Sequence, residues 1–180
     1  MVIVLVIIII FVSTLFFWSF FTLVALIRTR GVPSVYLTKH QLKGIFENVK
    51  LDRNASLIDL GCGDGRVLRM FEKQGVRKLV GYEVNWWGIL RGRVINYFIK
   101  SKVKIKCKSF FSISLSEFDV VFCYLLPSCL ERLELKFKNE LKSGAMIISY
   151  GFSIPGWEDQ EVIYTNKENK KLNRIFVYKI

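Results

Sequence analysis

Metal-binding residues are scarce in this chain, which has one histidine, His40, and four cysteines without any Cys-x-x-Cys spacing. Structural zinc and iron–sulfur sites need several such ligands at short, regular spacings, so we expect no metal site. Three of the four cysteines stand in apolar strand or turn segments, where a buried free thiol is the usual state. Free thiols favour a reducing compartment such as the cytoplasm.

Charge is absent from Met1 to Ile27, where the only polar side chains are those of Ser13, Thr14, Ser19 and Thr22. A bilayer core needs about 20 apolar residues in a helix, so this segment is long enough to span it. A cleaved signal peptide would instead show a basic start, a shorter apolar core and a small-residue cleavage site, none of which is present. We therefore expect a retained, single-pass anchor. Arg28 and Arg30 follow it, which by the positive-inside rule leaves the rest of the chain in the cytoplasm.

Acidic residues are also few, 15 against 27 basic ones, and the net charge is +12. Part of this excess is a run from Lys100 to Lys108 in which every second residue is lysine. A period of two indicates a strand with lysines on one face and apolar residues on the other. Lysines protect an edge strand against pairing with other chains, and they also attract an anionic membrane surface. Nucleic-acid binding is the least favoured interpretation, because no aromatic residues alternate with these lysines.

A glycine-rich turn, Gly61-Cys62-Gly63-Asp64-Gly65, follows the short apolar run 56–60 and leads into a helical pattern that begins at Arg66. The next apolar run, 78–82, ends at Glu83. This is the β-α-β pattern of a nucleotide-type cofactor site, in which glycines let the backbone approach the ligand and an acid binds the ribose hydroxyls. Dinucleotide sites would have a third glycine at position 66, where this chain has Arg66.

The remaining patterns predict strands that alternate with helices, and hence a doubly wound α/β sheet. The predicted strands are 56–60, 78–83, 100–108, 118–124 and 145–150, followed by a hairpin of 161–165 and 174–179. The predicted helices are 38–49, 66–74, 86–99 and 128–141. Only residues 151–160 separate the fifth and sixth strands, too few for a full crossover helix. Because such sheets bind ligands beyond the carboxyl ends of their strands, the expected site wall comprises residues 61–65, 83–86, 109–110 and 124–127.

The glycine turn, with Asp59 two residues before Gly61 and with Glu83 after the second strand, resembles motif I of the class I S-adenosylmethionine (SAM) methyltransferases. The resemblance implies a Rossmann-like, mostly parallel sheet with a C-terminal antiparallel hairpin, and SAM as the cofactor. It implies that the cofactor is bound by Asp59, Gly61, Cys62, Gly63, Gly65, Glu83, Asn85, Ser109 and Phe110.

Two further segments, 119–127 and 148–157, resemble a small family of protein-lysine methyltransferases with broad-specificity archaeal members and membrane-anchored mitochondrial members. The segments 81–85 and 33–38 also match, the latter loosely, because Leu37 replaces a usual proline. The resemblance implies transfer to lysine amines, with Tyr124 as the catalytic residue beside the transferred methyl group. The alternative is that Tyr124 only packs against adenosine or the core. Trp86 and Ser109 depart from the family pattern, which usually has proline and aspartate there, and the serine is expected to weaken cofactor binding.

The sequence therefore predicts an anchor over 1–27, a connector over 28–37 and a methyltransferase domain over 38–180. The connector spans at most about 35 Å, which favours membrane-associated proteins as substrates. The alternatives are methylation of a lipid amine, methylation of RNA, and a SAM-binding adaptor without turnover.

Overall fold

The computed structural model of the protein describes residues 2–29, 35–158, 161–165 and 173–180. The chain divides into two compact units, Met1–Val35 and Tyr36–Ile180. The second unit starts two residues earlier than the sequence predicts, because Leu37 belongs to its hydrophobic core and is only 3% exposed. Residues 30–34 of the expected connector lie outside the described part of the chain.

The first unit is a single helix, α1 (Val2–Thr29). Its segment Val2–Phe20 has a mean hydropathy of 2.9 and is long and apolar enough to cross a membrane. The side chains of this segment are exposed in the chain itself, unlike those of a core helix. The hydroxyls of Ser13 and Thr14 donate to the backbone carbonyls of Ile9 and Ile10, four residues earlier. Such bonds satisfy hydroxyl groups within the helix, as a hydrocarbon environment requires.

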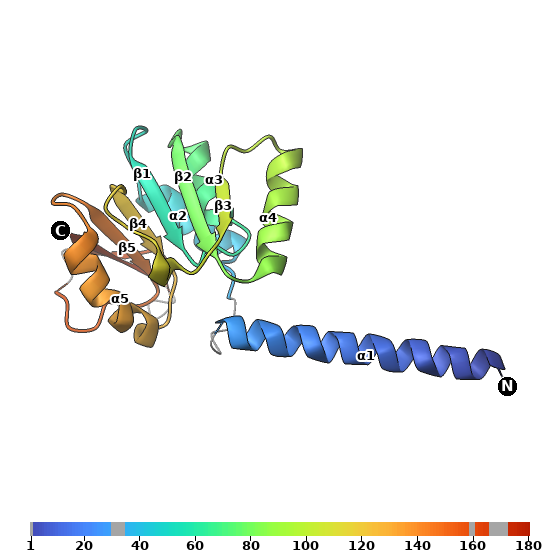
Figure 1. Cartoon of the computed structure of the whole chain (residues 1–180). Coiled ribbons are helices and arrows are strands. Elements are labelled where there is room, and N and C mark those ends of the chain that lie inside the picture. The colour runs from blue at the N-terminus through green and yellow to red at the C-terminus, as the bar shows by residue number, and fades with distance from the viewer. Residues whose placement is uncertain (1, 30–34, 159–160, 166–172) are drawn as a thin grey trace. The chain divides into compact units, whose positions relative to one another are not determined.

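The second unit holds a seven-stranded sheet in the order β3-β2-β1-β4-β5-β7-β6 (Figure 1). Strands β1 to β5 run parallel, and β7 runs antiparallel to both β5 and β6. The strands are β1 (Ser56–Leu60), β2 (Lys78–Glu83), β3 (Lys104–Cys107), β4 (Val120–Cys123), β5 (Met146–Tyr150), β6 (Glu161–Tyr164) and β7 (Arg174–Lys179). The helices are α2 (Lys39–Asn48), α3 (Arg66–Lys73), α4 (Trp86–Phe98) and α5 (Pro127–Glu140). The predicted doubly wound sheet with a C-terminal hairpin is confirmed.

Two hydrophobic cores lie on opposite faces of this sheet, because side chains alternate along each strand. Leu57, Val120 and Phe122 join one core, which also takes in residues of α2, α3 and α4. Ile58 and Val121 belong to the other core, with residues of α5. The predicted start of α2 is confirmed in detail: Thr38 accepts a bond from the Gln41 amide, and the Gln41 side chain accepts one from the Thr38 amide, which makes a capping box.

Strand β3 is shorter than the lysine alternation predicts. The carboxylate of Glu72 on α3 accepts hydrogen bonds from the Ser101 hydroxyl and the Lys102 amide, both at 2.6 Å. Lys100 has a φ of 55°, in the left-handed region. The start of the expected strand is therefore held as a turn between α4 and β3. The placement of β3 at the sheet edge is confirmed, and Cys107 at its end is exposed, whereas Cys62, Cys123 and Cys129 are buried free thiols.

The core formed with α5 is covered by few helices. A single 3₁₀ turn, Phe110–Ser112, lies between β3 and β4, and the described residues 151–158 contain no helix, as the sequence predicts for so short a connection. Loops close this face with specific bonds. The Glu140 carboxylate accepts a bond from the Leu115 amide, and the Tyr178 hydroxyl accepts one from the Ile154 amide.

Helix α4 approaches the glycine turn so closely that its packing depends on Gly92. A Cβ at this position would lie 2.5 Å from the Asp64 carbonyl oxygen and 2.5 Å from Ile105 Cδ1. Gly92→Ala gains about 1 kcal/mol in helix propensity, but overpacking against backbone costs roughly 1–3 kcal/mol or more. We expect a net loss of about 1 kcal/mol in denaturant unfolding. Val94→Ala, at an exposed position of the same helix, is the control and should stay within about 0.5 kcal/mol of wild type.

Candidate functional site

The candidate site lies at the carboxyl ends of β1, β2 and β4, where the strand order reverses. β1 pairs with β2 on one side and with β4 on the other. The helices that follow β1 and β2 contribute to one core and the helix that follows β4 to the other, so the chain diverges above these strands. In open α/β sheets this divergence is where ligands bind.

The glycine turn after β1 is fixed to the end of β2 by its backbone. The amides of Gly61 and Cys62 both donate to the Tyr82 carbonyl, at 2.9 and 3.1 Å, and the Gly65 amide donates to the Cys62 carbonyl at 2.8 Å. Gly61, Gly63 and Gly65 have φ values of 80°, 55° and 77°, which other residues adopt only with strain. The alternation of glycines in the sequence is therefore a requirement of this turn.

Glu83 connects the glycine turn to the start of α4. Its carboxylate is 8% exposed; one oxygen accepts from the Gly63 amide at 2.9 Å, and the other accepts from the amides of Val84 and Asn85 at 2.7 and 2.8 Å. Carboxylate oxygens can each accept about two bonds, so the oxygen that faces Gly63 retains acceptor capacity. The structure thus places the expected ribose-binding acid against the expected cofactor turn.

Two more carboxylates lie near this turn in opposite electrostatic situations. Asp64 pairs with Arg66 at 2.8 Å, Arg69 at 3.5 Å and Arg91 at 3.7 Å. Burial raises the pKa of Asp64, but the hydrogen bonds and positive charges of its arginines outweigh burial and the pKa is lowered overall. The pKa of Asp59 is raised well above its usual value, first by burial and then by the negative charges of Glu83 and Asp64. Asp59 is the uncompensated acid of the site, and such a group is suited to a cationic ligand.

The other expected cofactor residues border this turn. Asn85 caps α4 by accepting a bond from the Trp87 amide at 3.1 Å. A Cβ at Gly61 would lie 3.8 Å from Phe110 and 3.4 Å from Leu125, so these two apolar side chains flank the turn. Ser109 is the N-cap of the 3₁₀ turn and accepts a bond from the Phe111 amide at 3.4 Å.

Tyr124 follows β4 at the same edge of the sheet. Its ring packs edge-on against Tyr150, with centroids 5.5 Å apart and an interplanar angle of 84°. A Cβ at Gly151 would lie 3.2 Å from the Tyr124 ring, so the ring rests against a backbone position that has no side chain. Cys123, one residue earlier, is fully buried, and burial raises its pKa to about 12. This agrees with the prediction that Cys123 is a core residue and no nucleophile.

Tyr36 is part of the site although the sequence analysis did not select it. A Cβ at Gly63 would lie 2.8 Å from its ring and one at Gly88 would lie 3.2 Å from its hydroxyl, so Tyr36 covers both glycines. The Arg66 guanidinium lies 4.6 Å from the centre of the ring. The pKa of Tyr36 is raised by burial and by the charges of Asp64 and Glu83. Its only signal in the sequence is its position in the segment 33–38.

Comparison with known proteins gives consistent matches. Residues 59–161 match the model of a family described as the ANTKMT methyltransferase domain. A protein-lysine N-methyltransferase of Saccharolobus islandicus is 32% identical over 152 residues, which cover 83% of this chain and 94% of that protein. The adenine nucleotide translocase lysine N-methyltransferase of Mus musculus is 31% identical over 73% of this chain, and a lysine N-methyltransferase of Homo sapiens that is named for a component of ATP synthase is 29% identical over 76%. The matches span 58% of the length of each of these two relatives.

Among solved structures, an RNA methyltransferase from Salinibacter ruber in complex with S-adenosyl-L-homocysteine superimposes with a TM-score of 0.72 at 26% identity. The match covers 81% of this chain and 94% of that one. A ribosomal protein L11 methylase from Lactobacillus delbrueckii, at 12% identity and a TM-score of 0.60, shares the fold over 78% of this chain and 76% of that one.

Replacing Asp59 tests whether its charge is uncompensated in the ligand-free protein. Its raised pKa means that the ionised carboxylate destabilises the folded state at neutral pH, and this penalty is lost as the pH falls through the folded pKa toward the unfolded value of about 3.9. We expect ligand-free Asp59→Asn to unfold at higher denaturant concentration than wild type at neutral pH, with a difference that shrinks on acidification.

Asp119→Asn is the matched control of opposite sign. Hydrogen bonds from Lys142 and Ser56 lower the pKa of Asp119, so its charge stabilises the fold above the unfolded pKa and this contribution is lost as the pH falls. Unfolding midpoints across a pH series check both variants. An Asp59→Asn midpoint below that of wild type at neutral pH would show that the protein itself compensates this carboxylate.

Proposed function

The chain belongs to the ANTKMT methyltransferase family and is a SAM-dependent protein-lysine N-methyltransferase, and we propose that helix α1 anchors it in a membrane where it modifies membrane-associated proteins. The observation that carries the proposal is the joining of two features in one chain. One is the cofactor turn with the uncompensated Asp59, and the other is a helix apolar enough to span a bilayer.

The cofactor residues we propose are Asp59, Gly61, Cys62, Gly63, Gly65, Glu83, Asn85, Ser109 and Phe110, as the sequence predicts. SAM, when bound, supplies a methyl group on a sulfonium cation, which is already a good leaving group. The anionic environment of Asp59 and Glu83 fits such a cation, and the free acceptor capacity of Glu83 fits the ribose hydroxyls. Phe110 and Leu125, on either side of Gly61, provide an apolar wall for the remainder of the ligand. Ser109 accepts more weakly than a carboxylate would, and we expect it to reduce cofactor affinity.

A lysine amine reacts only in its neutral form, so the site must disfavour the ammonium ion. Burial in apolar surroundings lowers the pKa of an amine, and the side chains of Phe110, Leu125 and Tyr124 offer such surroundings at the carboxyl edge of the sheet. We propose that the Tyr124 hydroxyl orients the amine. Catalysis then consists mainly of positioning, because a correctly held nucleophile needs little acid–base assistance.

Membrane anchoring rests on α1 and on the sequence beside it. The span Val2–Phe20 lacks charged side chains, and Arg28 and Arg30 follow it, which favours a cytoplasmic catalytic domain. The second unit begins at Tyr36, and Tyr36 itself contacts the glycine turn. A connector this short limits the reach of the site to the neighbourhood of the bilayer. Proteins embedded in or bound to the same membrane are therefore the proposed substrates.

Transfer of labelled methyl from SAM to membranes of the source organism tests this function. The full chain, a variant without residues 1–30 and a Glu83→Ala variant as the inactive control are compared, and label is separated into protein, lipid and RNA. We expect label in discrete protein bands that map to methyl-lysine, with a narrower set of bands for the full chain than for the truncated one.

Each other outcome contradicts a distinct part of the proposal. Label in RNA would support the activity that the Salinibacter ruber relative is named for, and label in lipid would indicate a lipid amine. Identical bands for the full and truncated chains would show that anchoring does not select the substrate. SAM binding without any transfer would indicate an adaptor.

Two variants of Tyr124 separate orientation of the amine from simple packing. If the hydroxyl positions the amine, Tyr124→Phe lowers the transfer rate by on the order of a hundredfold and leaves SAM affinity unchanged. Tyr124→Ala also removes the ring that packs against Tyr150. Single-turnover rates and SAM titrations provide the measurement. A Phe variant as active as wild type, beside an inactive Ala variant, would show that the ring only packs.

A further inference from the structure

Helix α4 has its polar and apolar faces arranged in the reverse of the usual order. The residues it buries against the sheet are Gly88, Ile89, Gly92 and Asn96, two of which have no side chain. The residues it exposes are mainly aromatic and aliphatic. We call these the outer stripe of α4: Trp86 (40% exposed), Trp87 (60%), Leu90 (44%), Val94 (47%), Tyr97 (81%), Phe98 (76%) and the following Ile99 (55%). A helix on the surface of a soluble domain normally presents polar residues outward.

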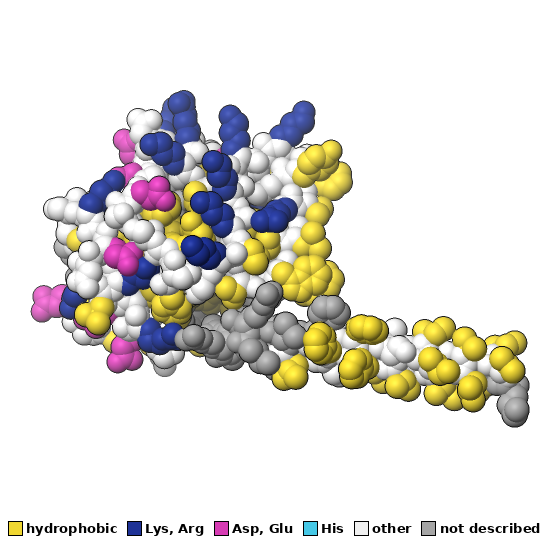
Figure 2. Space-filling model, viewed as in Figure 1, with side chains coloured by type: hydrophobic (Ala, Val, Ile, Leu, Met, Phe, Trp, Pro, Cys, Tyr) yellow, Lys and Arg dark blue, Asp and Glu magenta, His cyan; other side chains and the backbone are white. Residues whose placement is uncertain are grey.

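The outer stripe is continuous along the helix. Its members recur at helical spacing over 13 residues, a length of about 20 Å. Trp86 and Trp87 stack at its start, with ring centroids 4.2 Å apart, and Tyr97 and Phe98 meet edge-on at its end. Figure 2 shows hydrophobic side chains along the right-hand margin of the domain over α4. Contiguous exposed apolar surface of this kind marks an interaction site.

Positive charge surrounds the outer stripe without any acidic residue nearby in the sequence. From Val84 to Ser116 the chain has no Asp or Glu, and within this segment stand Arg91, Arg93, Lys100, Lys102, Lys104, Lys106 and Lys108. The side chain of Arg91 is 62% exposed. This pattern of cations beside an apolar aromatic face complements a surface that is anionic and has an apolar layer beneath.

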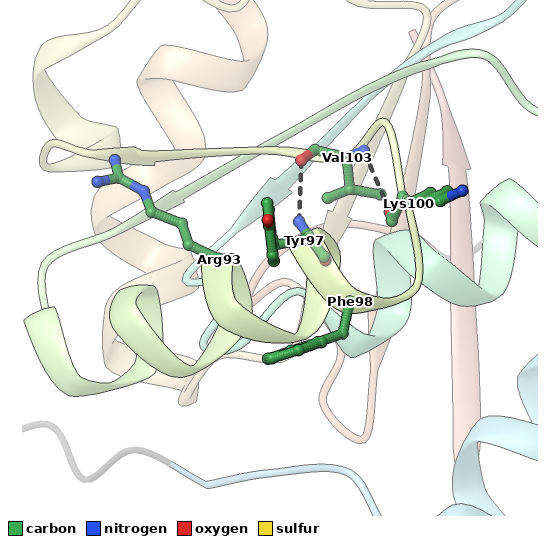
Figure 3. Close-up of a pocket in the computed structure, with 7 residues that line it drawn as sticks. Arg93, Tyr97, Phe98, Lys100 and Val103 are labelled. Carbon is green, nitrogen blue, oxygen red and sulfur yellow. Dashed lines mark hydrogen bonds between the residues drawn. The ribbon is translucent and has the colours of Figure 1, made fainter.

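A hollow of about 700 Å³ at the C-terminal end of α4 combines the same two features (Figure 3). Arg93 and Lys100 extend from opposite sides of it, with Tyr97 between them and Phe98 on the outer side. Bonds from the Asn96 side chain to the Val103 carbonyl and from the Val103 amide to the Ser101 hydroxyl hold its wall. Cations spaced around an aromatic ring suit the phosphate of a lipid headgroup and the start of its apolar chains.

We propose that the outer stripe of α4 docks the catalytic domain onto an anionic lipid bilayer. Tryptophan and tyrosine are the residues that favour the level of the headgroups, and the flanking arginines and lysines face the lipid phosphates. This contact is additional to α1 and stands whichever substrate the enzyme methylates. An acidic protein surface is the competing partner, but the bilayer is favoured because the stripe is long, continuous and cationic along its whole length.

Docking through α4 has a direct consequence for the active site. α4 begins immediately after Asn85, and a Cβ at Gly88 would lie 3.2 Å from the Gly63 backbone of the cofactor turn. The Trp86–Trp87 pair therefore lies beside the mouth of the site. Insertion of this pair at the membrane surface fixes the height at which a target lysine can enter.

Tryptophan quenching in the full chain tests the contact. The protein is reconstituted in vesicles of phosphatidylcholine alone or in an equal mixture with phosphatidylglycerol, with acyl chains brominated as the quencher. Trp18→Phe removes the tryptophan of α1, and Trp86→Phe/Trp87→Phe in that background gives the residual signal of Trp157. We expect quenching of Trp86 and Trp87 in the anionic vesicles and much less in phosphatidylcholine alone.

Matched variants test which side chains carry the docking. Tyr97→Ser/Phe98→Ser should reduce quenching of the tryptophan pair, whereas Leu135→Ser, at a 71% exposed position on α5, should not. Lys100→Asn and Lys102→Gln should each weaken docking by roughly fivefold, and Lys138→Gln on α5 should not. SAM titration of every variant confirms that it is folded.

A tryptophan pair that stays open to an aqueous quencher in anionic vesicles would overturn the proposal. So would shielding that appears only when membrane proteins are added, because it would identify a protein partner instead. Quenching of Trp18 in otherwise wild-type protein reports on α1 alone, and methyl transfer reports on the proposed function. Failure of either is therefore distinguishable from failure of α4 docking.

Discussion

The carboxylate of Glu83 is the contact on which the candidate site depends. It accepts hydrogen bonds from Gly63 in the turn after β1 and from Val84 and Asn85 at the start of α4. Three segments that are distant or divergent in the chain are thereby held at one buried acceptor. The left-handed glycines, the close approach of α4 and the cover provided by Tyr36 all assume this arrangement. The same group that fixes the turn is the one proposed to bind the cofactor.

Most of the sheet could be predicted from the sequence because its strands are buried on both faces. β1, β2 and β4 appear as nearly continuous apolar runs, and their positions follow from that composition alone. β3 could not be placed in the same way. Its alternation of lysine and apolar residues extends back to Lys100, but the bonds from Glu72 convert the first part of that pattern into a turn. A contact between α3 and a segment about thirty residues later has no trace in local periodicity.

The site was predictable to the extent that single residues carry the chemistry. Asp59 and Glu83 stand at fixed places relative to the glycines, and the structure brings them together as expected. The pairing of Asp64 with three arginines and the position of Tyr36 were not predictable, because they depend on how α4 and the segment before α2 fold back over the turn. The outer stripe of α4 was visible only as an unexplained Trp86–Trp87 pair until the burial of Gly88 and Gly92 showed which face points outward.

The few helices on the α5 face bear on how the enzyme chooses among proteins. Short loops held by Glu140 and Tyr178 replace the helices that could follow β3 and β5, so little polypeptide surrounds the site on this side. A domain so spare has few side chains with which to read the sequence around a lysine. On the proposed function, recognition is then a matter of address: the enzyme modifies the amines that share its membrane and its height above it, and its substrate range can change by relocation without any change at the site.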